Sequence, residues 1–133
     1  MKIFLSYKFN GEDPEILKEI ITKIGDSLEK AGHICFCSFW HEDFYHENKF
    51  THKQILEHAL EELKQSDINL AFVKSADKSE GMLLEAGYAL AQKKKFYLAI
   101  KKGVETVFLR EIADKVIEFE DLDDLYEKLN GLE

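Results

Sequence analysis

The sequence predicts an α/β protein with three layers, an α/β/α sandwich around a parallel five-stranded sheet. Short apolar runs alternate along the chain with longer segments in which apolar residues recur at helical spacing. Helical segments between successive strands are typical of the crossovers in parallel sheets. The 133 residues are 45% hydrophobic and 33% charged, which is enough apolar material for one core. We therefore expect a single domain that spans residues 1–133.

The first strand is expected at Lys2–Ser6, an apolar run that ends in a polar loop. The loop closes with Asp13 and Pro14, a carboxylate that can cap a helix and a proline suited to its first position. A helix should therefore begin at Pro14, and Gly32 is its expected stop. The second strand is expected at Ile34–Phe39.

Residues 40–49 mix aromatic and charged side chains without a period, which predicts a loop that could roof a pocket. The other expected elements are helices at about 51–65, 80–94 and 122–129 and strands at Asp67–Val73, Lys95–Ile100 and Lys115–Phe119. Right-handed crossovers between these strands give a flavodoxin-like, or Rossmann-like, layout with helices on both faces. Ligands bind such sheets at the carboxyl ends of the strands, where the loops 7–11, 40–49 and 74–81 would converge.

The charge composition excludes some partners. With 18 Lys and Arg against 26 Asp and Glu, the net charge is −8, which argues against a nucleic-acid polymer, because phosphate backbones require a dense basic patch. No apolar stretch approaches the roughly 18 to 20 residues of a membrane span, and the apolar start of the chain is too short for a signal peptide. We expect a cytoplasmic protein without a membrane partner.

The cysteine and histidine spacings match no metal-binding pattern. Cys35 and Cys37 are expected to be buried free thiols. The histidines of the central region are five or six positions apart, which fits no zinc motif, and they are expected on the solvated surface. No metal or other cofactor is therefore expected. Trp40, Phe44 and Tyr45 are expected either to stack on a base or to pack on their own domain.

Glu85 is the most unusual charged residue of the sequence. It lies within about 100° of the apolar side of its expected helix, where a carboxylate is costly unless it is paired or used. Gly87 beside it leaves room for the close approach of another group. Pairing of Glu85 with Lys78 or Lys93 is the structural explanation. The functional explanation is a carboxylate nucleophile that attacks a sugar carbon.

The segment around Glu85 resembles the signature of a known enzyme family. Ser79 stands six positions before Glu85, residues 85–90 read Glu-Ala-Gly-Tyr-Ala-Leu, and the strand Lys95–Ile100 follows. This pattern is similar to that of the nucleoside 2-deoxyribosyltransferases and the related 2′-deoxynucleoside 5′-phosphate N-hydrolases. The resemblance implies that Glu85 attacks C1′, the base leaves, and water or a second base takes the deoxyribosyl group. It also implies a small-molecule nucleoside or nucleotide as substrate and a homodimer or higher homo-oligomer.

The same resemblance implies positions that bind the substrate. Ser79 would donate to a 5′-phosphate, and Thr106, with Phe108 beside it, would reach the site from a neighbouring subunit. Lys8 or Lys78 would supply positive charge. The expected substrate-binding residues are Ser6, Tyr7, Lys8, Ser79, Gly81, Gly87, Thr106 and Phe108, and the expected catalytic residue is Glu85.

Two positions depart from the family pattern. Phe4 stands where the family usually has a Tyr that orients the Glu, and Tyr7 could substitute only if its loop bends back. Ala59 stands where the family has a catalytic Asp, which leaves the general acid unassigned. A catalytically impaired module that binds a nucleotide or signals is therefore an alternative.

A second resemblance is to TIR domains, which share this layout. The run Phe4–Tyr7 and the downstream Gly11–Asp13 are similar to the first strand and loop of those domains. Many TIR domains also place a helix Glu six residues after a Ser, but with a Trp between them where this chain has Gly81. As a TIR-like enzyme the protein would use Glu85 to cleave the nicotinamide N-glycosidic bond of NAD. The residues after Glu85 favour the deoxyribosyltransferases.

Overall fold

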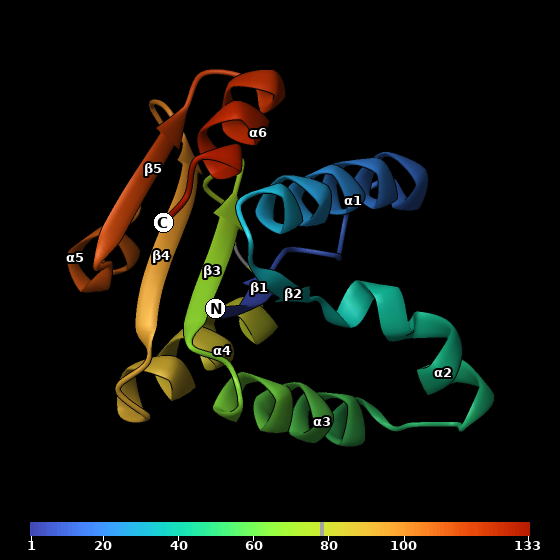
Figure 1. Ribbon diagram of the computed structural model, residues 1–133. Coiled ribbons are helices and arrows are strands. Elements are labelled where there is room, and N and C mark those ends of the chain that lie inside the picture. Colours follow the sequence, from blue (N-terminus) through green and yellow to red (C-terminus); the bar gives the residue numbers. More distant parts are fainter. Residues whose placement is uncertain (78) are drawn as a thin grey trace.

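The computed structural model describes residues 1–77 and 79–133 and confirms the α/β class (Figure 1). Five strands form one sheet in the order β2-β1-β3-β4-β5, and every neighbouring pair is parallel. The strands are β1 (Lys2–Ser6), β2 (Ile34–Phe36), β3 (Ile68–Val73), β4 (Lys95–Lys101) and β5 (Lys115–Phe119). The chain moves outward from β1 to β2 and then returns to the other side of β1. This reversal lies between β1 and β3, and in such sheets the reversal point opens a crevice at the carboxyl ends of the strands.

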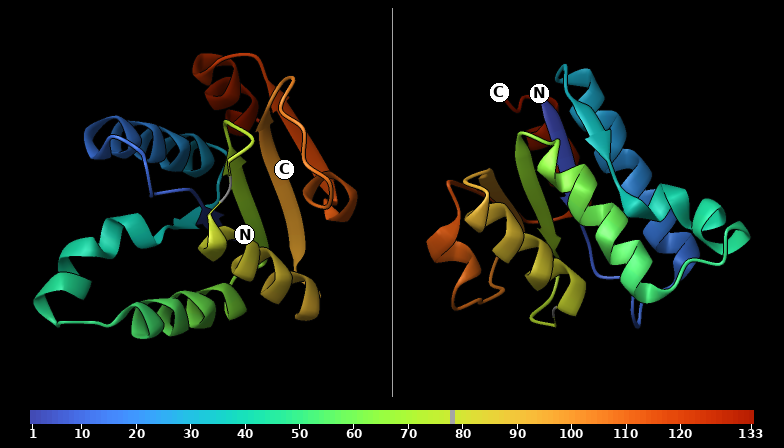
Figure 2. Two further views of the ribbon diagram at one scale, coloured as in Figure 1. Left: turned by 180° about the vertical axis from the view of Figure 1, so that it is seen from behind. Right: turned by 90° about the horizontal axis from the view of Figure 1, so that it is seen from below.

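Helices cover both faces of the sheet (Figures 1 and 2). They are α1 (Pro14–Lys30), the 3-10 helix η1 (Ser38–His41), α2 (Glu42–Glu47), α3 (His52–Lys64), α4 (Glu80–Ala91), α5 (Leu109–Ile112) and α6 (Leu122–Asn130). The buried apolar residues of α1 and α6 form one core with one face of the sheet. Those of α3, α4 and α5 pack against the opposite face.

Capping hydrogen bonds, of which the sequence predicts the one at Asp13, account for where two of the long helices begin. The Asp13 carboxylate accepts hydrogen bonds from the backbone N–H groups of Glu15 and Ile16, and Pro14 occupies the first position of α1. Thr51 and Gln54 form a reciprocal capping box at the start of α3. These local hydrogen bonds fix the points at which the chain leaves its loops.

The region after the second strand differs from the expectation. The strand ends at Phe36 rather than at position 39, and residues 38–47 form η1 and α2 instead of an irregular loop. The cause is burial: Tyr45 is 2% exposed, and its hydroxyl lies 2.8 Å from Nδ1 of His58. His41 stacks on Phe36 with 4.9 Å between the ring centroids. The expectation of solvated histidines is therefore wrong for His41 and His58, which are half-buried in an aromatic cluster.

The two cysteines are free, as expected. Burial raises the pKa of the Cys35 thiol to about 12 and that of Cys37 well above its ordinary value. Both thiols therefore stay protonated and unreactive at neutral pH. Within the described part of the chain, no helix combines the length and the apolar character needed to cross a membrane.

The packing of α1 on Trp40 gives a first test. A Cβ atom on Gly25 would lie 2.7 Å from the indole of Trp40, so in Gly25→Ala the indole must move. Because the chain has one Trp, its fluorescence reports that movement directly. We expect emission at longer wavelength and a lower melting temperature, although Ala favours a helix by about 1 kcal/mol over Gly.

Gly87→Ala is the matched control, because Gly87 is also inside a helix and, beyond that stretch of helix, no atom of residues 1–77 and 79–133 lies within 4 Å of its Cβ position. It should leave the fluorescence unchanged and raise the melting temperature slightly. The account of this contact fails if Gly25→Ala behaves like Gly87→Ala in both measurements.

Candidate active site

Glu85 lies in α4, which begins directly after the loop that leaves β3. The Ser79 hydroxyl accepts a hydrogen bond of 3.0 Å from the N–H of Met82 and so caps the helix. Met82, Ala86 and Ala89 are the buried inner face of α4. Glu85 stands at the border of this face and is half-buried, as its place in the sequence predicts.

The Glu85 carboxylate is held from the neighbouring strand β1. It is hydrogen-bonded to the hydroxyl of Ser6, the last residue of that strand, which is 1% exposed. The amide of Asn69, on β3, donates to the same Ser6 oxygen over 2.9 Å. A buried row of polar groups therefore leads from the centre of the sheet to the carboxylate.

Burial raises the pKa of Glu85 from 4.5 to about 7, and the hydrogen bond from Ser6 opposes part of this rise. Among the described residues no Lys or Arg forms an ion pair with Glu85, including Lys93. Lys78, the other expected partner, lies outside the described residues. Glu85 thus titrates near neutral pH, where carboxyl groups of catalytic sites are often found.

A pocket of about 190 Å³ opens in front of Glu85. Its described lining residues are Tyr7, Phe9, Asn10, Ser38, Ser79, Gly81 and Glu85. They come from the loop after β1, the end of the β2 segment and the start of α4. The pocket therefore occupies the crevice at the reversal of the strand order, where the topology predicts a ligand site.

Tyr7 is the polar aromatic residue of this pocket. Burial raises the pKa of its hydroxyl well above the ordinary value, and Ser38 is hydrogen-bonded to it. Its ring meets Phe39 edge to face, with 5.7 Å between the centroids. Tyr7 therefore presents a protonated hydroxyl at neutral pH from a ring fixed by packing.

Lys8 lies elsewhere. It lines a separate small cavity with Glu12 and Lys74, and its ammonium is 3.9 Å from a carboxylate oxygen of Asp77. Lys74 is in turn paired with Glu12 at 2.8 Å. The structure gives Lys8 no place in the pocket of Glu85, because its side chain is turned to the neighbouring loop.

Only one of the remaining expected positions is among the described residues that line the pocket. Gly81 lines the pocket, whereas Gly87 is exposed on the outward face of α4, and among the described residues no atom beyond its own stretch of helix lies within 4 Å of its Cβ position. Thr106 accepts a hydrogen bond from the N–H of Arg110. Phe108 is 73% exposed, and neither it nor Thr106 is among the described residues that line the pocket of their own chain.

The two departures from the family pattern are absorbed by the core. Phe4 is fully buried and Ala59 is 3% exposed, and both belong to one apolar cluster with Phe36 and Leu63. Phe4 stacks on Phe36 with 5.4 Å between the centroids. Apolar packing thus occupies the positions of the absent hydroxyl and carboxylate.

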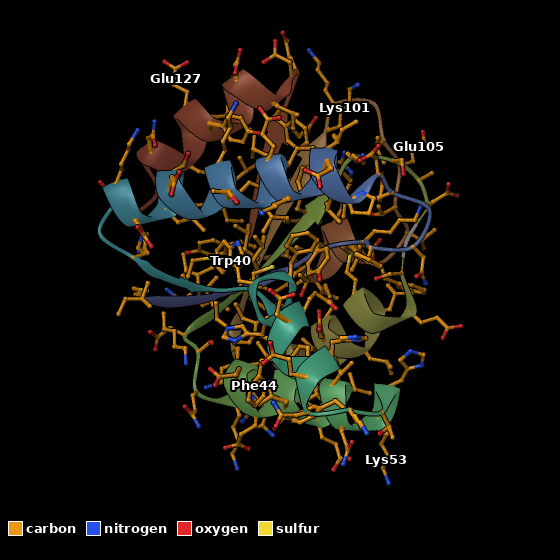
Figure 3. All side chains as sticks on the ribbon, turned by 90° about the vertical axis from the view of Figure 1, so that its right-hand side faces the viewer. Trp40, Phe44, Lys53, Lys101, Glu105 and Glu127 are labelled. Carbon is orange, nitrogen blue, oxygen red and sulfur yellow. The ribbon has the colours of Figure 1, made fainter. Side chains whose placement is uncertain are left out.

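Trp40, Phe44 and Tyr45 pack on their own domain, which is one of the two alternatives expected for them. Figure 3 shows Trp40 beneath α1 and Phe44 beside α3, and Tyr45 is buried in the aromatic cluster. None of the three is among the described residues that line the pocket. Phe9, Asn10 and Ser38 also line the pocket, and none of them is among the residues expected from the sequence. Their signal was their place in or beside the loops that follow the first two strands.

Comparison with known proteins identifies the family. The model of the nucleoside 2-deoxyribosyltransferase family matches residues 6–122. This chain belongs to that family. Its members are deoxyribosyltransferases and N-glycosidases of nucleosides and nucleotides. Of the two resemblances in the sequence, the first is therefore confirmed.

Solved structures show the same fold. The CMP N-glycosidase BcmB of Clostridium botulinum has 20% identity and a TM-score of 0.71, with 98% of each chain covered. A 2-deoxyribosyltransferase of Bacillus psychrosaccharolyticus has 21% identity and a TM-score of 0.66, covering 97% of this chain and 96% of that one. A conserved protein of Enterococcus faecalis V583 has 12% identity and a TM-score of 0.62 with the same coverage. The curated proteins contain no match.

The raised pKa of Glu85 predicts a pH-dependent effect on stability. The folded protein holds this proton up to about pH 7, whereas the unfolded chain releases it near 4.5, so the wild type loses stability as the pH rises between these values. Glu85→Gln lacks this loss. We expect it to exceed the wild type in free energy of unfolding by about 1–3 kcal/mol at pH 8 and to have no such advantage at pH 4.

Urea unfolding at the two pH values measures this difference. Glu19→Gln is the control, because Glu19 is exposed and its pair with Lys23 lies at the surface. A Glu85→Gln protein that is no more stable than the wild type at pH 8 would show that burial does not disfavour the ionised form of the Glu85 carboxylate.

Proposed function

We propose that this protein cleaves or exchanges the N-glycosidic bond of a (deoxy)nucleoside or its 5′-monophosphate, with Glu85 as the nucleophile. One observation carries the proposal. Glu85 is a half-buried carboxylate that faces the pocket at the strand ends and has no cation partner among the described residues, in a chain whose family consists of N-glycosidases and deoxyribosyltransferases. Its pKa of about 7 leaves much of it ionised at neutral pH.

The reaction proceeds by two displacements at C1′. A carboxylate oxygen of Glu85 forms a bond to C1′ while the C1′–N bond breaks, and the electron pair of that bond leaves with the base, which takes up a proton. Water then attacks C1′, loses a proton and releases the Glu85 carboxylate. When a second base attacks in place of water, the product is a new nucleoside, so hydrolysis and exchange share the first step.

The start of α4 supplies a site for the phosphate. Ser79 and Gly81 line the pocket at the N-terminal turn of this helix, where free N–H groups and the helix dipole favour an anion. This arrangement compensates for the absence of Lys8 from the pocket. The rings of Tyr7 and Phe9 offer apolar surface to the sugar or the base.

The protonation of the leaving base sets the expected rate. Among the described lining residues Glu85 is the only carboxylate, and the position of the family's catalytic Asp is the buried Ala59. A general acid accelerates such a reaction by about 10²–10⁴-fold, so we expect turnover slower by about this factor than in an enzyme of the family that has the Asp. The same observation favours a second candidate function, a module that binds a nucleotide and does not turn it over.

A second copy of the chain is the expected partner. The outward face of α4 exposes Leu84 and Leu90, each 55% accessible, and the segment before α5 exposes Val107 and Phe108 by more than 70%. Because α4 and α5 pack on one core cluster, these side chains lie on the same side of the molecule. Exposed apolar surface of this kind is typical of an interface. We infer a homodimer in which Thr106 and Phe108 of one copy complete the pocket of the other.

A panel of substrates tests the reaction. Deoxynucleosides, nucleosides, their 5′-monophosphates and NAD are incubated with the protein, and the free base is followed by chromatography. We expect base release from one or more nucleosides or monophosphates, and its loss by at least about 10³-fold in Glu85→Gln. Glu127→Gln, an exposed substitution on α6, should retain full activity. Activity that survives in Glu85→Gln contradicts the nucleophile.

The remaining outcomes of this panel select between the alternatives. If no compound is cleaved but a monophosphate raises the melting temperature, the protein is a binding module. Release of nicotinamide from NAD alone would assign it the TIR-like activity.

The inferred dimer predicts a phosphate-specific role for Thr106. Thr106→Ala should weaken the binding of a monophosphate by about tenfold and leave that of the free nucleoside unchanged, because only the phosphate reaches the hydroxyl. Calorimetric titration of both ligands measures the difference. Equal loss for both ligands, or a wild type that sediments as a monomer, contradicts the shared site.

A further inference from the structure

Asn69 is a polar residue at the centre of an otherwise apolar strand. It is fully buried on β3, and its register partners are Phe4 on β1 and Phe96 on β4. A buried amide is costly unless its polar atoms are hydrogen-bonded. None of the steps of the proposed reaction uses this side chain, so its presence requires a separate explanation.

The hydrogen bonds of Asn69 point in one direction. Its amide nitrogen donates to the carbonyl oxygen of Phe4 over 3.2 Å and to the hydroxyl oxygen of Ser6 over 2.9 Å. Because a carbonyl can only accept, the nitrogen must face β1, which fixes the orientation of the amide. Ser6 Oγ accepts from Asn69, so its own proton is free to be donated to Glu85, to which it is hydrogen-bonded.

We propose that Asn69 is a positioning residue, which acts through Ser6 to hold the Glu85 carboxylate in the orientation for attack. The inference rests on the proposed role of Glu85 as nucleophile. Both connecting side chains are sealed from solvent, Asn69 fully and Ser6 to all but 1%, so water does not compete for these hydrogen bonds. Phe4, the neighbour of Asn69 on β1, has no hydroxyl that could do this.

The other end of the Asn69 amide supports a role beyond folding. Its oxygen is buried and, within residues 1–77 and 79–133, has no hydrogen-bond partner. An apolar residue with the same branching, such as Leu, would occupy the position without this unpaired oxygen. The amide therefore makes the strand less stable than it need be, which is the pattern expected of a residue kept for the site.

The test measures the ionisation of Glu85 in variants of this row. The pKa of Glu85 is read from the ¹³C shift of its carboxyl group, which needs no substrate. Removing the hydroxyl in Ser6→Ala should raise this pKa above its value of about 7, because the donor to the carboxylate is lost. Asn69→Leu should raise it too, while the melting temperature stays equal or increases.

The double variant shows whether Asn69 acts through Ser6. If it does, Asn69→Leu adds nothing to the pKa in the Ser6→Ala background. Ser66→Ala is the matched control, because Ser66 is also 1% exposed and its hydroxyl bonds a backbone carbonyl remote from the pocket. Should Asn69→Leu not fold, Asn69→Ala gives the same comparison. An unchanged Glu85 pKa in a folded Asn69 variant overturns the proposal.

Kinetics separates this inference from the proposed function. With a substrate that the wild type cleaves, Asn69→Leu should lower kcat by about tenfold to a hundredfold with little change in KM, and move the acid limb of the pH profile upward. If the variants shift the Glu85 pKa but the wild type cleaves no substrate, the proposed reaction is contradicted, whereas the hydrogen-bonded row from Asn69 to Glu85 is supported. If Asn69→Leu cleaves the substrate with the kcat of the wild type, the positioning role of Asn69 is contradicted, whereas the proposed reaction is supported.

Discussion

The desolvation of the Glu85 carboxylate is the constraint on which the rest of the site depends. A helix that faces a sheet would ordinarily present an apolar residue at this border, and α4 does so at Met82, Ala86 and Ala89. Glu85 is tolerated because Ser6 donates to it and because one side faces a pocket. Weak compensation of this kind leaves the carboxylate with a raised pKa, whereas a Lys or Arg partner would have stabilised its ionised form.

The topology of the sheet makes that compensation available. Ser6 ends β1, Asn69 lies on the adjacent β3, and the loop after β3 leads into α4, so three polar groups distant in sequence meet at the reversal of the strand order. The same reversal separates the loops after β1 and β3 and opens the pocket. The start of α4, one turn before Glu85, also places Ser79 and Gly81 in the lining of the pocket, where the N–H groups of a first helical turn favour an anion.

Local signals in the sequence were sufficient for most of the fold and for one site residue. Asp13 caps its helix as predicted, and the apolar runs indicated the strands, because these features depend on neighbours in sequence; the caps Thr51 and Ser79 are equally local but were not predicted. Glu85 was recognisable as a charge beside an apolar helix face. The helices at 38–47 were not, since the burial of Tyr45 against α3 stabilises them without a periodic pattern.

Positions that depend on long-range contacts could not be predicted. The Lys8 side chain lies toward Asp77 on a loop distant in sequence, and the row from Asn69 to Glu85 joins residues from three elements. A lone Asn in an apolar strand was the available sign of that row, but sequence does not show which side chain it meets. The place of Phe108 beside the pocket of a second copy, which the family resemblance implies, depends on contacts between chains and stays a prediction.

The proposed reaction requires that Glu85 becomes bonded to C1′ of the sugar. It is tested most directly with a 2′-fluorinated analogue of a cleaved substrate, because the fluorine slows release of the sugar from the enzyme. After the reaction is quenched, the protein is digested and its peptides are weighed by mass spectrometry. The account predicts the added mass of the sugar on Glu85, and no adduct in Glu85→Gln. Release of the base with an unmodified Glu85, or with the sugar attached to another residue, would contradict it.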